Sequence, residues 1–331
     1  MANVNMNRRD VLKTIGAGAA AAAIGTAMCA AEPPPAGKKA KPTGKLTLGI
    51  FTSVYAHLPL AEAVQRIKAD GFGGVVLEGA FKDIRFDPWK PDWDVLKKIT
   101  AALQKEDLRV AGLYGYYNVI DPDPARRQHG QARIELLIKE WKRFGSPIVS
   151  TETGSFNPQS EFEDDPKNHT PEGYAECRKA FETLVRAAEK TKAIIAIEPY
   201  WHNCIDSIER AERLFHDISS PSLKLTMDPC NFYRPEDLPK MKPMLEEMFK
   251  RLGPQIVIAH AKDVIANGKD TGLPAAGLGA MDYPTFLKLL AGLKKDLFLM
   301  IEHLNLDDVP RARDFVNDQM KKVLAAPPAG K

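Results

Sequence analysis

The sequence predicts an α/β protein with a single (β/α)8 TIM barrel, and three observations support this fold. Short apolar runs rich in β-branched residues alternate with longer helix-like segments along most of the chain. Such near-continuous apolar runs are typical of strands that are buried on both faces of a parallel sheet. The last four runs each end on a residue that can bind a metal ion. About 285 residues follow the N-terminal segment, which suits one barrel domain with one large core.

The expected elements follow the order strand then helix throughout. The strands are predicted at 46–51, 74–77, 109–114, 148–151, 193–197, 223–227, 256–259 and 297–301. The helices are predicted at 60–70, 93–106, 125–144, 172–190, 207–218, 240–252, 283–294 and 309–324. In the helix at 172–190, Phe181, Leu184, Val185 and Ala188 are spaced i, i+3, i+4 and i+7, which gives one apolar stripe. We expect this stripe to pack against the barrel.

The N-terminal residues predict an export signal of the twin-arginine type. Arg8 and Arg9 precede an apolar, Ala-rich run to about Ala27, which is the order of a charged n-region and an apolar h-region. At roughly 15 residues this run is too short to span a membrane stably, so we expect cleavage near Ala31. The predicted organisation is a signal peptide at 1–31, a flexible linker at 32–45, the barrel at 46–324 and a disordered tail at 325–331.

Charge and cysteine content argue against three kinds of protein. The chain holds 46 Lys and Arg against 43 Asp and Glu, but seven of the basic and only two of the acidic residues lie in the first 45 positions. The remaining 39 basic and 41 acidic residues leave the barrel slightly acidic, which does not predict nucleic-acid binding. After signal removal three cysteines remain (Cys177, Cys204 and Cys230), and none has C-x-x-C spacing. This pattern argues against a disulfide framework and against a structural zinc site.

Four residues at the ends of apolar runs predict a metal site. These residues are Glu198, Asp228, His260 and Glu302, and they lie 30, 32 and 42 residues apart. That spacing is close to the roughly 31 residues of one βα unit, and a barrel gathers its C-terminal strand ends around one mouth. Carboxylates together with one imidazole favour a divalent ion such as Mn²⁺, with Mg²⁺, Co²⁺ or Zn²⁺ as alternatives. The competing interpretation is a buried ion pair for each carboxylate, with His260 as an ordinary core residue.

Five motifs between Lys192 and Glu302 carry a family resemblance. They are Ile197-Glu198-Pro199, Leu225-Thr226-Met227-Asp228-Pro229, His260-Ala261-Lys262-Asp263, Gly277-Leu278-Gly279-Ala280-Met281-Asp282-Tyr283 and Met300-Ile301-Glu302. In this order and spacing they resemble the xylose isomerase-like TIM-barrel superfamily, specifically its sugar phosphate isomerase/epimerase group. The resemblance implies that the four predicted ligands fall on the metal positions of the family, with the two glutamates also serving as acid and base. The chain departs from the pattern at Asn231, where many members carry a histidine.

Further residues near the strand ends are candidates for substrate binding. They are Glu152, Trp201, His202, Asn231, Lys262 and Asp263, with Glu78 as a secondary candidate. The resemblance implies that Lys262 and Asp263 contact the substrate or support the metal ligands, with a solvent-exposed ion pair as the alternative. His202 and Asn231 are equally consistent with capping, surface or turn roles. His303 is left out, because strand alternation points it away from the mouth.

Three long loops follow strands, at 115–124, 153–171 and 263–282, and all are expected on the catalytic side of the barrel. The loop at 153–171 is either a lid or a surface insertion. The segment Gly277-Leu278-Gly279 lies where many barrels bind phosphate, but a turn requirement explains two glycines as well.

These observations and the resemblance together predict a metal-dependent isomerase or epimerase that acts through an enediolate. Because phosphorylated sugars are mostly cytoplasmic and this chain carries an export signal, the expected substrate is an unphosphorylated sugar or keto-sugar. The alternative is a lyase or hydratase that uses the same site to expel a hydroxyl or glycosidic group. A third interpretation is a periplasmic carbohydrate-binding protein without catalysis, against which the two glutamates Glu198 and Glu302 argue.

The expected partners follow from the same observations. They are a small-molecule sugar and the twin-arginine export machinery, with no nucleic acid and no stable membrane span after processing. The expected location is periplasmic or otherwise exported. The sequence leaves the oligomeric state open, a homo-oligomer included.

Overall fold

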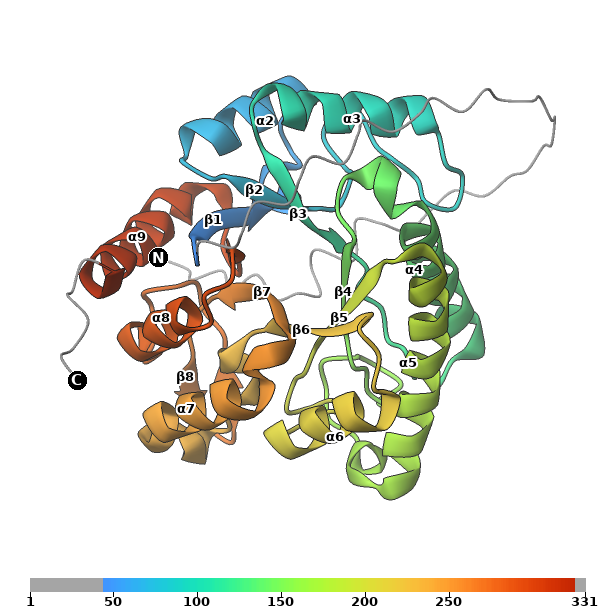
Figure 1. The fold of residues 1–331 in the computed structure, drawn as a ribbon, viewed down its shortest axis with the longest axis vertical. Helices are drawn as coiled ribbons and strands as arrows, with labels where there is room; N and C mark the ends of the chain where they lie inside the picture. The colour runs from blue at the N-terminus through green and yellow to red at the C-terminus, as the bar shows by residue number, and fades with distance from the viewer. Residues whose placement is uncertain (1–43, 325–331) are drawn as a thin grey trace.

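Eight parallel strands close into a barrel, and helices surround it on the outside (Figure 1). The structure is a computed structural model that describes residues 44–324. The barrel strands are β1 (Leu46–Phe51), β2 (Gly74–Leu77), β3 (Arg109–Tyr114), β4 (Ile148–Glu152), β5 (Ile194–Glu198), β6 (Leu223–Met227), β7 (Ile256–Ala261) and β10 (Leu297–Ile301). Their order around the barrel is β1-β10-β7-β6-β5-β4-β3-β2, and β1 closes onto β10 with Ile50 opposite Ile301. The predicted (β/α)8 fold is therefore confirmed.

The described residues contain the predicted barrel but not the segments around it. The predicted signal peptide at 1–31, the tail at 325–331 and nearly all of the linker at 32–45 lie outside the described residues. Within 44–324, no helix is long and apolar enough to cross a membrane.

The helices begin and end within two residues of the predicted positions. They are α2 (Leu60–Ala69), α3 (Trp93–Lys105), α4 (Pro124–Phe144), α5 (Pro171–Thr191), α6 (Ile208–Ile218), α7 (Met241–Leu252), α8 (Tyr283–Gly292) and α9 (Val309–Leu324). Local sequence explains the limits of α4. The Asp123 side chain accepts hydrogen bonds from the first-turn N–H groups, and Gly145 takes the left-handed conformation, with φ of 92°, that ends the helix.

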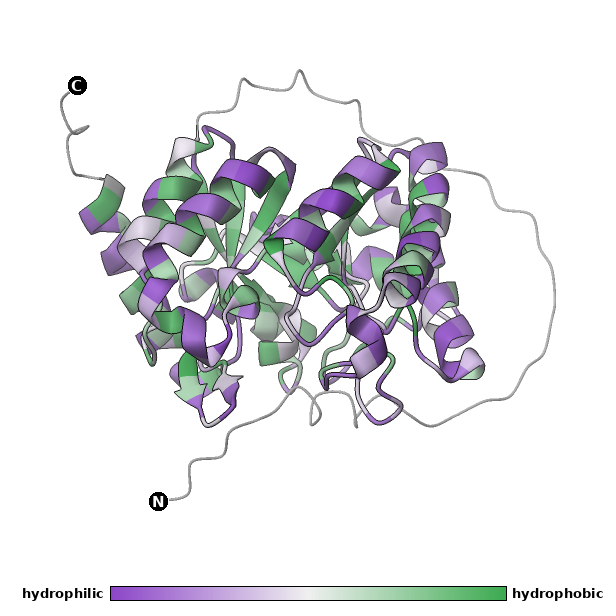
Figure 2. Cartoon of the chain, turned by 90° about the horizontal axis from the view of Figure 1, so that it is seen from below, coloured by the Kyte–Doolittle hydropathy of each residue, from purple (hydrophilic) through white to green (hydrophobic). Residues whose placement is uncertain are grey.

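The strands separate two apolar regions, because successive side chains point to opposite faces. Phe51, Val76, Ala111, Ile258 and Met300 form one cluster inside the barrel. A much larger cluster fills the space between the strands and the helices. Figure 2 shows the same division, with hydrophobic strands enclosed by helices whose outward faces are hydrophilic.

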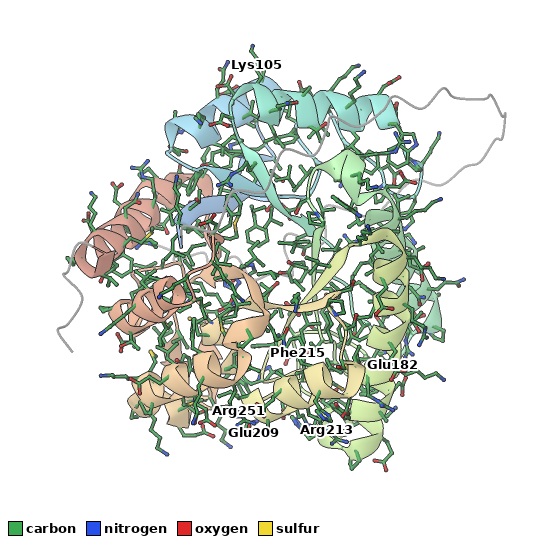
Figure 3. All side chains as sticks on the ribbon, viewed as in Figure 1. Lys105, Glu182, Glu209, Arg213, Phe215 and Arg251 are labelled. Carbon is green, nitrogen blue, oxygen red and sulfur yellow. The ribbon has the colours of Figure 1, made fainter. Side chains whose placement is uncertain are left out.

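Ion pairs join neighbouring helices on the outer surface. Arg251 of α7 lies 2.6 Å from Glu209 and 2.7 Å from Glu212, both on α6, and Figure 3 shows Arg251 and Glu209 side by side there. Both glutamates are exposed, so each pair contributes at most about 1 kcal/mol. These surface ion pairs therefore contribute little to stability, and apolar packing stabilises the barrel.

One pair of strands was not predicted. The segment 263–282, expected as a loop, contains an antiparallel hairpin of β8 (Ile265–Asn267) and β9 (Asp270–Gly272). Gly268, at the first central position of its two-residue turn, has φ of 64°, as the turn of a tight hairpin requires. The hairpin is too short and too polar to stand out as alternating apolar residues.

Candidate metal centre and active site

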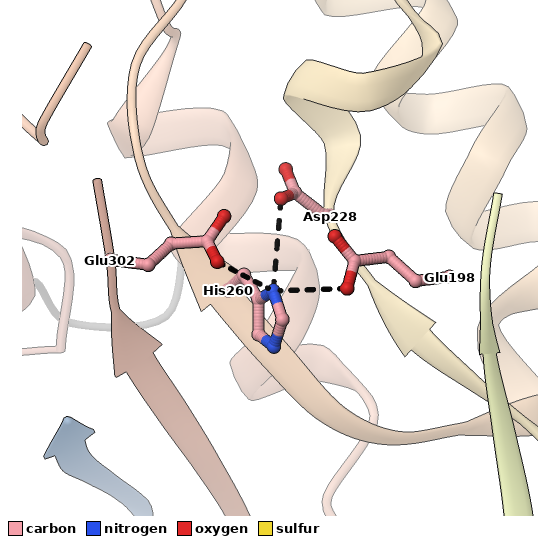
Figure 4. Close-up of side chains that lie close together, drawn as sticks. All are labelled: Glu198, Asp228, His260 and Glu302. Carbon is pink, nitrogen blue, oxygen red and sulfur yellow. Dashed lines mark ion pairs between the residues drawn. The ribbon is translucent and has the colours of Figure 1, made fainter. Parts of the chain in front are cut away.

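The four predicted metal ligands meet at the mouth of the barrel. Glu198, Asp228, His260 and Glu302 come from the C-terminal ends of the neighbouring strands β5, β6, β7 and β10, and all four are buried. Figure 4 shows the three carboxylates directed at Nδ1 of His260, which lies 3.5 Å from Glu198 Oε2, 3.8 Å from Asp228 Oδ2 and 3.4 Å from Glu302 Oε2. One potential ligand atom from each residue lies within 4.8 Å of all the others.

The alternation of side chains along each strand places these ligands. Ile258 of β7 and Met300 of β10 lie inside the barrel, so His260 and Glu302, two residues further on, face the mouth. In β6, Thr226 lies inside the barrel, where its hydroxyl donates to Ser150, and Asp228 is again two residues further on. Glu198 and His260 lie within the last two residues of β5 and β7 rather than after these strands. The hydrogen-bonded ladders of the parallel strands extend further than the apolar runs.

The geometry fits a divalent metal ion. Both ring nitrogens of His260 are buried, and neither makes a hydrogen bond within residues 44–324. Two donor atoms that share a metal at about 2.1 Å lie about 3.0 Å apart at a right angle and about 3.6 Å apart at 120°. The separations of 3.4–3.8 Å around His260 Nδ1 match this spacing and are too long for hydrogen bonds.

Charge also suits such an ion. Burial opposes the imidazolium form of His260, but the carboxylates of Glu198 and Glu302 outweigh burial and hold its pKa well above the ordinary value. Without a metal ion, a proton on His260 supplies the positive charge that balances the carboxylates. A bound cation would replace that proton, since a histidine that binds a metal must be neutral. The residues therefore fit a metal through both their spacing and their charge.

Lys262, a predicted site residue, lies against two of the four predicted ligands. It is buried, and its Nζ lies 2.7 Å from Asp228 Oδ2 and 3.0 Å from Glu302 Oε1. At Glu302, burial opposes the charged carboxylate, but the positive charges of Lys262 and His260 outweigh it and hold the pKa well below the ordinary value. At Asp228 burial dominates over the attraction of Lys262 and raises the pKa.

Asn231 connects this lysine to the other side of the site. Its side chain is fully buried, with Nδ2 donating to Glu198 Oε1 at 2.7 Å and Oδ1 accepting from Lys262 Nζ at 2.7 Å. It lies in a short 3₁₀ helix that begins after Asp228, whose Oδ1 accepts from the N–H of Cys230. The departure from the family pattern thus lies among the ligands, where it orients Glu198.

Trp201 and His202 lie at the edge of the site rather than among the ligands. His202 donates from Nδ1 to the carbonyl oxygen of Phe162 at 2.9 Å, and its Nε2 lies 3.6 Å from Asp270 Oδ1 of β9. Trp201 donates from Nε1 to the hydroxyl of Thr271, also in β9. In the described part of the chain, neither side chain hydrogen-bonds to a ligand residue. These two residues join three loops over the mouth.

Asp263 organises a loop. Its buried carboxylate accepts hydrogen bonds from the N–H groups of Val264, Gly277 and Met281. Gly277 has φ of 85°, and a Cβ at Gly279 would lie 2.5 Å from Asp263 Oδ1. The turn itself therefore requires both glycines.

Glu152 ends β4 in register with Glu198 of β5, and its side chain is buried. The structure thus brings Glu152, Asn231 and Lys262 into the mouth. Trp201, His202 and Asp263 take positions around it.

Three residues that the sequence did not single out also reach the site. Tyr116 follows β3, and its hydroxyl donates to Glu198 Oε2 at 2.5 Å. Arg133 of α4 donates to the backbone carbonyl of Tyr116. His303 lies with Nε2 3.7 Å from Glu302 Oε1, because β10 has ended and His303 takes a left-handed φ of 59°. The tyrosine-rich run after β3 was the only sequence signal for the first of these, and the alternation argument for His303 was wrong.

Comparisons with known proteins agree with this architecture. The sequence profile of the xylose isomerase-like TIM barrel matches residues 64–319. The chain belongs to this family. A twin-arginine translocation signal matches residues 5–25, so the chain carries a signal for export. A search of curated proteins finds no significant match.

Solved structures of this family share the fold at low sequence identity. The 3-keto-D-glucoside 4-epimerase YcjR from E. coli is 17% identical with a TM-score of 0.62, covering 85% of this chain and 100% of its own. The probable 3-DHS dehydratase AsbF from Bacillus anthracis is 16% identical with a TM-score of 0.62, covering 85% and 99%. A xylose isomerase-like TIM barrel protein from Mycobacterium smegmatis, in complex with magnesium, is 13% identical with a TM-score of 0.61, covering 84% and 97%. At this low sequence identity the similarity to these structures shows a shared fold only.

Proposed function

We propose that this protein is a metal-dependent isomerase or epimerase of an unphosphorylated sugar or keto-sugar. The observation that carries the proposal is the pair of buried carboxylates, Glu198 and Glu302, on either side of His260. Their placement suits proton transfer at a carbon atom held between them. Family membership and a neighbour described as a keto-glucoside epimerase support the same chemistry.

The residues of this chain have distinct roles in the proposal. Glu198, Asp228, His260 and Glu302 hold a divalent ion, for which we propose Mn²⁺. The bound ion supplies Lewis acidity worth several kcal/mol, which acidifies the C–H beside a sugar carbonyl. One glutamate removes that proton to give an enediolate, and the other returns a proton, either to the opposite face or to the adjacent carbon. Such acid–base help contributes about 10²–10⁴ in rate.

Supporting residues orient this pair. Asn231 and Tyr116 donate to separate oxygens of Glu198, which fixes the plane of its carboxylate. Lys262 places a positive charge beside Glu302 and Asp228. With three carboxylates and one lysine, the cluster carries a charge that one divalent ion neutralises, which favours a divalent over a monovalent ion.

A lyase is the second candidate, because one of the structural neighbours is described as a probable dehydratase. In that reaction the same enediolate would expel a β-hydroxyl or a glycosidic group instead of regaining a proton. The first steps and the residues that perform them would be the same.

The test combines metal analysis with isotope exchange. The wild type, incubated with Mn²⁺ and desalted, should retain about one ion per chain, and the Asp228→Ala/His260→Ala variant should retain none. Incubation with keto-sugars in D₂O should incorporate one deuterium without other change of mass if the enzyme is an isomerase or epimerase. Loss of water or of an alcohol would identify a lyase.

Two further variants separate catalysis from binding. Glu302→Gln should abolish deuterium incorporation while sugar affinity changes by only a few fold, and the exposed control Glu236→Gln should behave as the wild type. A wild type that binds sugar but exchanges no deuterium would overturn the enzymatic proposal in favour of a carbohydrate-binding protein.

A further inference from the structure

The mouth of the barrel has two halves of different composition. The four metal-ligand positions come from β5, β6, β7 and β10, which are neighbours in the barrel. The other half is formed by β1, β2, β3 and β4, and β2 lies four strands from β6 in either direction. A residue at the end of β2 therefore lies across the mouth from Asp228.

Glu78 is that residue. Val76 of β2 packs inside the barrel with Phe51, whereas Val75 and Leu77 face the helices, so the next inward position is Glu78. Asp228 and Glu302 likewise come one residue after their strands and face the mouth.

The first 3₁₀ turn after β1 fixes the position of Glu78. Its Oε2 accepts from the backbone N–H of Ser53 at 2.6 Å, and its own N–H donates to the hydroxyl of Thr52 at 3.0 Å. The carboxyl group is held by the backbone of a neighbouring strand end and is not left to rotate freely. Such anchoring by surrounding structure is the arrangement that a binding residue needs.

The positive charge that acts on Glu78 is that of Arg133, which forms no ion pair with it. Arg133 is partly buried, donates to the carbonyl of Tyr116 and forms no ion pair within the described chain. Burial raises the pKa of Glu78 to about 7, although hydrogen bonds from Ser53 and, after them, the positive charge of Arg133 act to lower it. The carboxyl group is thus anchored by Ser53 and lies within the electrostatic influence of Arg133.

Aromatic rings connect this pair to the metal-ligand half. The guanidinium of Arg133 lies 5.6 Å from the centre of the Tyr114 ring, and the rings of Tyr114 and Tyr116 are 4.7 Å apart. The hydroxyl of Tyr116 in turn reaches Glu198. A polar and aromatic wall therefore runs from Glu198 to Arg133, of the kind that lines small-molecule sites.

We propose that Glu78 and Arg133 form a distal subsite for the hydroxyl end of an unphosphorylated sugar whose carbonyl end lies at the metal ligands. This inference rests on the proposed function for the orientation of the sugar. Hydroxyl groups both donate and accept, so a carboxyl group and a guanidinium group at the same half of the mouth can bind them together. A phosphate at the same place would be attracted by Arg133 and repelled by the charged form of Glu78, so comparing a ketohexose with its 6-phosphate tests whether Glu78 dominates.

The test is calorimetric titration of the Mn²⁺-loaded protein with D-fructose, D-tagatose and D-psicose and with D-fructose 6-phosphate. The wild type should bind at least one ketohexose more tightly than the phosphorylated sugar. Glu78→Gln and Arg133→Gln should each weaken ketohexose binding by about tenfold, the value of one hydrogen bond to a charged group. Glu78→Gln should also reduce the ratio of the ketohexose affinity to the D-fructose 6-phosphate affinity.

Controls separate this inference from the proposed function. Metal content and circular dichroism should be unchanged in both variants, and Glu62→Gln, exposed on α2, should bind as the wild type. Deuterium exchange, measured on the same samples, reports the proposed function. Weaker binding by the variants without exchange in the wild type would retain the subsite and reject the reaction.

Three outcomes would overturn the subsite. They are unchanged ketohexose affinity in both variants, a wild type that binds none of the three ketohexoses, and a wild type that prefers the 6-phosphate. Two independent variants are used so that one poorly folded protein does not decide the result.

Discussion

Lys262 Nζ lies 2.7 Å from Asp228 Oδ2 in an ion pair whose two side chains are fully buried. The same ammonium lies 3.0 Å from Glu302 Oε1, so one lysine holds two predicted metal ligands from different strands. Buried ion pairs are costly to form, and removing one partner leaves an uncompensated charge. The lysine is therefore part of the electrostatic balance of the cluster.

Lys262→Met should destabilise the metal-free protein by about 3–5 kcal/mol, because two buried carboxylates, Asp228 and Glu302, would lose the lysine that pairs with both. Mn²⁺ should restore more stability in the variant than it adds to the wild type, since the ion neutralises the same carboxylates. Urea unfolding with chelator and with Mn²⁺ measures both effects.

The matched control for that change is Lys224→Met on β6, whose Nζ donates to the amide oxygen of Gln255 at 2.8 Å. Loss of this single hydrogen bond to a neutral amide, at a partly exposed position, should cost no more than about 1.5 kcal/mol. A Lys262 variant as stable as the wild type in chelator would show that the carboxylates do not need this charge.

Tyr116→Phe should lower kcat by about tenfold, with metal content unchanged, because the change removes one hydrogen bond to the carboxylate of Glu198. Steady-state kinetics on the substrate identified by deuterium exchange measures the effect. Tyr117→Phe, at the adjacent position, provides the control. If the two variants had equal kcat, the contact between Tyr116 and Glu198 would have no role in turnover.

Glu78→Gln should change how stability depends on pH. Burial raises the pKa of Glu78 from 4.5 to about 7, so the folded protein keeps this proton at a pH where the unfolded chain has lost it. Between those two values the native state binds more protons, and its free energy of unfolding falls as pH rises. The glutamine variant has no such proton to lose. Between pH 4.5 and pH 8 its free energy of unfolding should therefore rise, relative to that of the wild type, by at most about 3 kcal/mol.

Chemical denaturation of both proteins at several pH values provides the measurement. A difference in unfolding free energy that stays constant across this range would contradict the buried, raised-pKa state of Glu78.

Asn168→Ala should destabilise the protein by about 2–4 kcal/mol. Its fully buried side chain accepts from the N–H of Phe156 and donates to Ser155 Oγ and to the carbonyl of His202. These bonds hold the segment 153–170 against the loop after β5, so we expect this segment to be a fixed wall of the mouth. Denaturation reports the stability, and hydrogen exchange should show protected amides in the segment.

The control for Asn168 is Asn267→Ala, exposed at the end of β8, where no comparable loss is expected. Rapid exchange throughout 153–170 in the wild type would instead favour a lid.

The barrel was predictable because its signals are local. Eight apolar runs and eight amphipathic segments mark strands and helices through burial and periodicity, and the strand ends identify Glu198, Asp228, His260 and Glu302 as neighbours at one mouth. The hairpin β8–β9 was not found, since three-residue polar strands carry no such periodicity.

The repeating order of elements and the four residues at the ends of β5, β6, β7 and β10 could be predicted, because alternation and strand polarity act within each segment. Which other side chains reach those four residues depends on the packing of the whole chain. Tyr116 and Arg133 arrive from a loop and a helix that are distant along the chain, and Asp263 turns to the backbone of its own loop. These contacts depend on how separate elements pack and on which buried polar atoms need partners, and neither is written in the period of a single segment.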